Sequence, residues 1–185
     1  MKRICSGVSN RSVHPGWQVA ALVALLCFVV AGVVPLWKPV RTRVFYRYCN
    51  NKLNGALEAY YQRPFNDVTN ILAECIRFVR AYEKPLSRFF DVNAVLFDKH
   101  IKYAYMLLHS GGEDAALYHL NEAYKYHARS RARSGGMPVP RSDFVDFVIR
   151  GIEWVDGHYN VAWKSEVVLC SNIVSRVTAR FATEE

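Results

Sequence analysis

An uncharged apolar stretch lies near the beginning of the chain, from Trp17 to Trp37. Residues 18–36 contain no charged side chain, and Gln18 is their one strongly polar residue. A helix of this length spans roughly the 30 Å hydrocarbon core of a bilayer, and tryptophan at both ends is typical of membrane interfaces. The alternatives are a cleaved signal peptide, whose apolar run is shorter, and a buried core helix. The sequence favours an uncleaved transmembrane anchor over residues 17–37.

The formal net charge of +8 is confined to one part of the chain. Residues 1–57 hold eight lysines and arginines and no acid, whereas basic and acidic residues balance from Glu58 onward. We therefore divide the chain into a basic, acid-free tail (1–16), the anchor (17–37), a basic juxtamembrane segment (38–57) and an α-helical domain (58–185). Because that domain is neutral, it lacks the broad positive surface of nucleic-acid binding, and nucleic acid is not an expected partner.

Basic residues flank the anchor on both sides. Arg41, Arg43 and Arg47 follow it closely, so we expect them to contact lipid headgroups and to favour the positive-inside face for the C-terminal side. The tail has the basic, serine-containing, acid-free composition of mitochondrial presequences. The sequence therefore predicts a single-pass protein of a mitochondrial membrane, inner or outer, with the endoplasmic reticulum or a bacterial inner membrane as alternatives.

Beyond residue 44 the apolar positions repeat at helical spacing, and no segment alternates with the period of a strand. One stripe between Pro64 and Pro85 predicts a helix, and it consists of Val68, Ile71, Leu72, Cys75, Ile76, Val79 and Tyr82. A shorter helix is expected over Leu86–Phe97, and a helical hairpin over Tyr103–Tyr126. The predicted fold class is all-α: one transmembrane helix followed by a bundle of helical hairpins.

An arginine-rich loop is expected at 128–141, because Gly135, Gly136, Pro138 and Pro140 disfavour regular structure. Two further helices follow it. The first has an apolar face made of Phe144, Phe147, Val148, Gly151, Ile152 and Val155 and should end at an Asp156–Gly157 turn. The last carries Val167, Cys170, Val174, Val177 and Phe181. In the loop, Arg129, Arg131 and Arg133 are candidate contacts for an acidic protein partner, although a solvated loop is the plainer interpretation.

The predicted hairpin carries small residues at regular places. Ala104, Gly111, Ala116 and Ala123, with Leu107 and Leu120, fall where a tetratricopeptide repeat places its helix-crossing residues, its turn glycine and its large apolar residues. The stretch 100–128 thus resembles that family, although His100 and Ala128 stand at the family's tryptophan and proline positions. A weaker echo at 149–170 repeats the step at Gly157 and Ala162. An ordinary helical hairpin in a small bundle is the alternative.

No catalytic or metal-ligand motif is found in the sequence. The five cysteines form no CxxC pair, the six histidines are scattered, and His109 is expected to cap a helix C-terminus as a cation. We therefore predict a non-enzyme without cofactor or metal: a membrane-anchored adaptor or assembly scaffold that binds protein partners. The alternative is a structural accessory subunit of a large mitochondrial inner-membrane complex of the oxidative-phosphorylation type.

Overall fold

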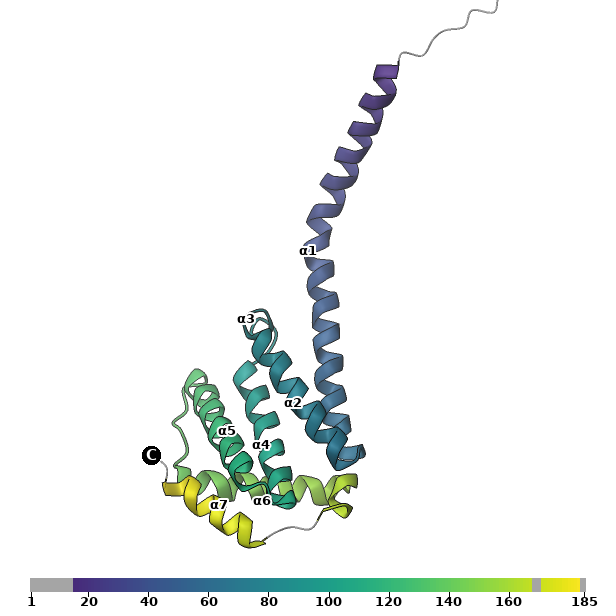
Figure 1. Cartoon of the computed structure of the whole chain (residues 1–185). Coiled ribbons are helices and arrows are strands. Elements are labelled where there is room, and N and C mark those ends of the chain that lie inside the picture. The colour runs from purple at the N-terminus through teal and green to yellow at the C-terminus, as the bar shows by residue number, and fades with distance from the viewer. Residues whose placement is uncertain (1–14, 168–170, 184–185) are drawn as a thin grey trace, which may run out of the picture. The chain divides into compact units, whose positions relative to one another are not determined.

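The computed structural model describes residues 15–167 and 171–183, and none of these residues is in a strand. The prediction of an all-α chain is confirmed. In chain order the elements are α1 (Pro15–Gln62), α2 (Phe65–Ala81), α3 (Glu83–Leu86), α4 (Val92–Ser110), α5 (Glu113–Arg133), α6 (Arg141–Tyr159), the 3₁₀ helix η1 (Ala162–Ser165) and α7 (Ser171–Thr183) (Figure 1). The chain forms two compact units, one ending at Phe45 and one beginning at Tyr46.

The first unit contains the beginning of α1, which exposes a run of large apolar side chains. Leu22, Leu25 and Phe28 are all exposed, Phe28 to 83%. The helix bends by 46° between Val19–Val33 and the part that starts at Trp37. Pro35 lies at this bend and has no backbone N–H to donate. No single described helix is long and apolar enough to cross a membrane by itself, whereas these two parts taken together satisfy the requirement by length and composition only.

In the second unit, α4 and α5 form an antiparallel hairpin. Asp91 caps α4 by accepting a hydrogen bond from the backbone N–H of Asn93 at 3.0 Å. Gly111 ends α4 in the left-handed conformation, with a φ of 86° that favours glycine. Ala104 and Ala116 are completely buried where the two helices pack, as expected for a close helix approach.

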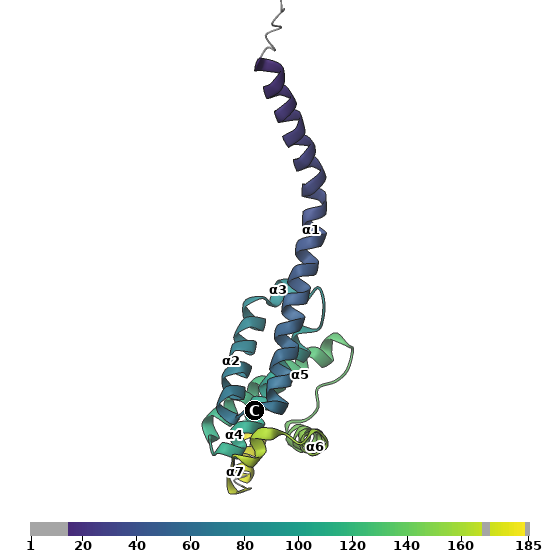
Figure 2. The same cartoon turned by 90° about the vertical axis from the view of Figure 1, so that its right-hand side faces the viewer.

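Two clusters of buried side chains hold the second unit together. One joins the end of α1 to α2, α4 and η1, and it contains Tyr60, Val68, Leu72, Tyr105, Met106, Val161 and Trp163. The other joins the α4–α5 hairpin to α6 and α7, and its largest side chains are Phe144 and Phe181. Figures 1 and 2 show that α2, α4 and α5 lie side by side, whereas α6 runs across the hairpin and is seen end-on in Figure 2.

The predicted helix over Leu86–Phe97 is wrong. The short helix α3 ends at Leu86, and α4 begins only at Val92, after a turn. Asp91 explains the boundary, because a capping carboxylate favours a helix start immediately after it. The hairpin's first helix is therefore longer than predicted, and its first turns lie in the stretch that the sequence pattern joined to residue 86.

Only the second half of the arginine-rich stretch 128–141 is a loop, because its first half is helical. Helix α5 continues to Arg133, so that Arg129, Arg131 and Arg133 lie on its last turns and only residues 134–140 form the connection. The helix ends where the backbone N–H of Gly136 donates to the carbonyl of Arg131 at 2.8 Å. Gly135 has a φ of 75°, so α5 ends at a glycine cap. The alternating arginines before it do not interrupt the helix.

The expected Asp156–Gly157 turn is wrong as well. Helix α6 continues to Tyr159, and the left-handed residue that ends it is Asn160, with a φ of 50°. Gly157 is therefore helical and Ala162 opens a 3₁₀ turn, so the echo at 149–170 contains no second hairpin of α-helices in its described part. Val167 lies in a bend before α7, and Cys170 falls outside the described residues.

Candidate functional site

A groove of about 400 Å³ crosses the face formed by α2, α4 and α5. Its lining comes from all three helices: Ala73, Ile76, Arg77, Arg80, His100, Tyr103, Tyr118 and His119. The helical period brings these residues to one face, because Arg80 follows Ile76 by four positions and Arg77 by three on α2, and Tyr103 follows His100 by three on α4. No acidic side chain lines the groove. We call it the His100–His119 groove.

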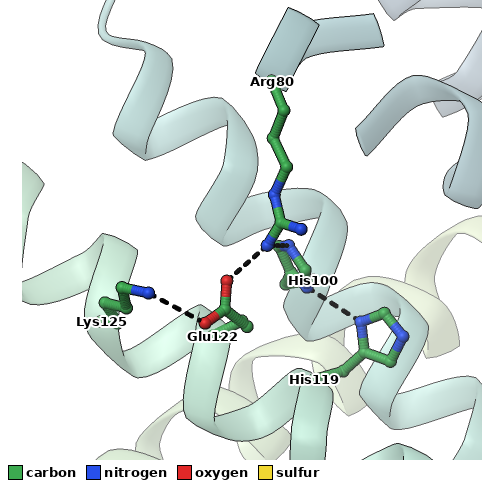
Figure 3. A network of polar contacts seen from close by, with 5 residues as sticks. All are labelled: Arg80, His100, His119, Glu122 and Lys125. Atoms are coloured by element: carbon green, nitrogen blue, oxygen red, sulfur yellow. Dashed lines mark hydrogen bonds and ion pairs between the residues drawn. The ribbon is translucent and has the colours of Figure 1, made fainter. Parts of the chain in front are cut away.

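Two histidines meet inside this groove (Figure 3). The Nδ1 atoms of His100 and His119 are 2.8 Å apart, and Nη2 of Arg80 lies 3.3 Å from Nε2 of His100. Burial, the neighbouring His119 and Arg80 lower the pKa of His100 to about 3. Burial and Arg80 lower the pKa of His119 to about 4. Both rings are therefore neutral at pH 7.

Arg80 is held in place from the side of α5. It forms an ion pair with Glu122, and Lys125 binds the other oxygen of the same carboxylate at 3.1 Å (Figure 3). The guanidinium also lies 5.8 Å from the centre of the Tyr126 ring. Arg77, in contrast, is exposed and forms no ion pair with another described residue. In this groove the charge of Arg80 is thus neutralised by Glu122, whereas no described acid neutralises the charge of Arg77.

The described residues contain no group of three histidine, cysteine, aspartate or glutamate side chains placed to hold a metal ion. His109 also differs from expectation, because its ring is buried rather than exposed at the helix end. Burial and the neighbouring Lys164 lower its pKa to about 4, so the predicted cationic helix cap is wrong. The ring instead packs edge-on against Trp163 at 5.3 Å between centroids.

A second, more apolar groove of about 380 Å³ lies between the end of α1, α4 and α6. Tyr60 and Tyr61 form one wall, Phe97 and Ile101 another, and Phe147 and Ile152 of α6 the third. Phe147 was predicted on the buried stripe of its helix, yet 71% of it is exposed. Trp154, two helical turns further along, is exposed to 72%. We call the surface of Phe147, Gly151 and Trp154 the α6 face.

The arginines proposed to bind a partner all contact their own chain. Arg133 pairs with Asp91 at 3.4 Å, and Nε of Arg131 donates to the carbonyl of Met137 at 3.3 Å. The guanidinium of Arg129 lies 5.6 Å from the centre of the Tyr126 ring. Their positions on α5 and these contacts show that Arg131 and Arg133 help to hold the end of the helix and the following connection.

The other predicted residues lie on α1 and in the α4–α5 hairpin. Arg41, Arg43 and Arg47 are exposed on α1. Ala104, Ala116 and Ala123 are completely buried between helices, and Gly111 forms the turn between α4 and α5. The large aromatic residues Phe144 and Trp163 are completely buried and belong to the core.

The sequence contained a signal for the histidine pair that was missed. Ala104 and Ala116 face each other across the hairpin, His100 lies one turn before the first, and His119 lies one turn after the second. In an antiparallel pair of helices these positions are opposite each other as well. No protein-family model, curated protein or solved structure matches the chain.

Proposed function

We propose that this chain is a single-pass membrane protein whose helical domain acts as an adaptor or assembly scaffold for protein partners. The observation that carries the proposal is the α6 face. Phe147 and Trp154 lie seven residues apart on one side of the helix, and both are more than two-thirds exposed. Large aromatic side chains lose much water-exposed surface when a partner covers them, and they are enriched at the centres of interfaces.

The small residue between the two rings also favours a docking surface. Gly151 is exposed and lies one helical turn after Phe147 and about one turn before Trp154. No heavy atom outside its own helix backbone and chain neighbours comes within 4 Å of where a Cβ would stand. A partner can therefore approach the α6 backbone between two aromatic side chains, as small residues permit at helix contacts.

The proposed membrane anchor rests on the uncharged stretch Trp17–Trp37 and on the exposed apolar side chains of α1. Arg41, Arg43 and Arg47 would then contact anionic headgroups at the end of the anchor. We propose a mitochondrial membrane on the basic, acid-free composition of the tail, with the endoplasmic reticulum or a bacterial inner membrane as alternatives. Carbonate extraction of purified organelles tests both points: release of the full chain into the soluble fraction would contradict the anchor.

We further propose that α4 and α5 form a tetratricopeptide-like hairpin. The buried alanines Ala104, Ala116 and Ala123 and the left-handed Gly111 support it. The next helix does not continue the repeat side by side, because residues 134–140 intervene and α6 runs across the hairpin (Figures 1 and 2). The resemblance is therefore proposed for one hairpin and not for a stacked array.

The second candidate function is a structural accessory subunit of a large mitochondrial inner-membrane complex. The contacts of Arg131 and Arg133 favour it, because arginines engaged with Met137 and Asp91 are less available to steer an acidic client. In that case the α6 face is covered permanently by a neighbouring subunit. The two functions differ in the lifetime and stoichiometry of the complex and share the surface.

Affinity purification of the tagged full chain in mild detergent, at low and high salt, tests the proposal. The variant Phe147→Ser with Trp154→Ser should lose the partner, whereas Met137→Ser, which removes another side chain of high exposure, should retain it. Recovery that falls with salt favours the adaptor, and a stoichiometric complex at both salts favours the subunit. Equal recovery from the double variant and from the control would contradict partner binding through the α6 face.

A further inference from the structure

The His100–His119 groove has a fixed direction of hydrogen bonding. A guanidinium can donate but never accept, so the Arg80 contact at 3.3 Å requires an unprotonated Nε2 on His100. The neutral His100 ring then carries its proton on Nδ1 and donates it to Nδ1 of His119, 2.8 Å away. The neutral His119 ring must therefore carry its own proton on Nε2. This chain of bonds ends in a free N–H donor.

That donor belongs to the groove. His119 is part of the groove lining, and no hydrogen bond joins its Nε2 to another residue in the described part of the chain. Figure 3 shows the second ring nitrogen of His119 on the side turned away from His100. The ring itself is held by Tyr103, whose centroid lies 4.2 Å away. The position of the donor is thus set by two neighbours before any ligand arrives.

The charges of the groove agree with the direction of its hydrogen bonds. Arg77 contributes a guanidinium that no described acid neutralises, and Tyr103 and Tyr118 add hydroxyl groups. Glu122 neutralises Arg80 but does not line the groove. The lining therefore offers donors from three helices and no carboxylate, which disfavours a cation. A metal ion is disfavoured as well, because it needs the lone pair that His119 uses to accept from His100.

We propose that the His100–His119 groove binds a phosphate group, either free or at the end of a larger molecule such as a lipid headgroup. Arg77 supplies the charge and His119 Nε2–H a second donor from a different helix. A phosphate matches donors that approach from several directions, because its oxygens are arranged around a central atom and each accepts hydrogen bonds, and arginine binds such groups well. This inference is independent of the α6 face and of the adaptor function.

Titration of the full chain, in a micelle of uncharged detergent at pH 7, with inorganic phosphate tests the proposal by calorimetry. Saturable binding is expected, and Arg77→Gln or His119→Phe should weaken it about tenfold or more, because each removes a charged or fixed donor. His119→Gln retains an N–H close to the position of Nε2 and should lose much less. Arg88→Gln, which removes an exposed arginine outside the groove, should bind as the unchanged chain does.

Absence of saturable binding would overturn the proposal. The proposal is also overturned if Arg88→Gln weakens phosphate binding as much as Arg77→Gln. Phosphate would then respond to the net charge of the chain and not to a specific site. Thermal unfolding of each variant, followed by circular dichroism, establishes that the helices are intact before its affinity is compared. For His119, the proposal requires the glutamine variant to bind more tightly than the phenylalanine variant, and a purely structural role of the ring predicts the reverse or no difference.

Vesicles distinguish the two sources of phosphate. One set contains phosphatidic acid in phosphatidylcholine, and the other phosphatidylcholine alone. If the headgroup is the ligand, Arg77→Gln should lower binding to the first set only, and inorganic phosphate should compete. If the ligand is free phosphate, the variant should lower the calorimetric affinity and leave vesicle binding unchanged. Either result retains a phosphate site, and an Arg77→Gln chain that behaves normally in both assays excludes it.

Discussion

The hydroxyl of Tyr60 donates a hydrogen bond to the completely buried carboxylate of Asp156, with Oδ1 at 3.0 Å and Oδ2 at 3.1 Å. The contact joins the end of α1 to α6 across 96 residues of sequence. Burial raises the pKa of Asp156, while the Tyr60 hydrogen bond and Lys164, 3.8 Å away, oppose that rise. The Tyr60 hydrogen bond thus lowers the free-energy cost of burying the Asp156 carboxylate.

We predict that Tyr60→Phe lowers the free energy of unfolding by about 1.5–3 kcal/mol at pH 7, the usual range for a hydrogen bond to a charged group. Adding Asp156→Asn to this variant should recover part of the loss, because it removes the buried charge. Urea unfolding of the single and double variants measures both changes. The assignment fails if Tyr60→Phe is as stable as the unchanged chain.

Stability should fall in mild acid because of buried histidines. The pKa of His109 is about 4 in the folded chain against 6.5 for a free ring, and burial is the first cause. A lowered histidine pKa contributes stability that is complete above pH 6.5 and is lost as the pH falls toward 4. The loss approaches about 1.4 kcal/mol per pH unit for each such ring. His100, whose pKa is about 3, should add to it.

The variant His109→Phe isolates one of these rings. Neither nitrogen of His109 has a hydrogen-bond partner, so phenylalanine loses no contact there and cannot be protonated. We expect its unfolding midpoint to exceed that of the unchanged chain at pH 5 and the difference to shrink at pH 7. Melting curves at both pH values measure this, with the exposed His158→Phe as the control. A difference that does not depend on pH would show that the ring's protonation is not involved.

The crossing of α4 and α5 predicts different outcomes for two neighbouring alanines. Ala116 is completely buried, whereas Ala115 is exposed. Ala116→Leu should overpack the contact and cost about 1–3 kcal/mol, and Ala115→Leu should cost much less. Thermal unfolding of the full chain compares them. Equal shifts would mean that the two helices do not depend on a close approach at this alanine.

Asp91 is expected to stabilise both the start of α4 and the end of α5, which lie together at the end of the hairpin away from its turn. Its carboxylate caps α4 through Asn93 N–H and accepts from the Ser130 hydroxyl at 2.6 Å. Asp91→Ala should therefore cost about 1–2 kcal/mol. Asp91→Asn keeps a capping oxygen and should cost less. Hydrogen exchange in the first turn of α4 and the last turn of α5 locates the effect, and protection unchanged in both turns would contradict it.

If the anchor is correct, the orientation of the chain in the membrane should depend on Arg41, Arg43 and Arg47. Their joint replacement by glutamine should weaken or mix the orientation, because the basic side of an anchor tends to stay inside. Protease access to a C-terminal tag on intact organelles measures this. A matched variant that replaces the exposed Arg63, Arg88 and Arg150 removes the same charge further from the anchor. Identical access for both variants would mean that these arginines do not set the orientation.

Local patterns in the sequence were sufficient for several elements. The stripe from Val68 to Val79 predicted α2, because an amphipathic helix buries residues at its own period whatever its partner is. Gly111 predicted the turn of the hairpin, since a left-handed residue after a helix favours glycine. The same reasoning misplaced the end of α5, where the alternating arginines remain helical and the stop lies at Gly135.

The tertiary structure alone decided which residues of a stripe are covered and which distant groups meet. Phe144 and Phe147 belong to the same predicted stripe of α6, yet Phe144 is completely buried and Phe147 is exposed to 71%. Phe144 packs into the core cluster that α6 shares with the hairpin and α7, and no local pattern encodes which part of the stripe meets that core. The contacts between His100 and His119 and between Tyr60 and Asp156 likewise depend on how separate helices pack. Sequence periodicity defines the faces of each helix, whereas the packing of the helices determines which faces remain open to a ligand or partner.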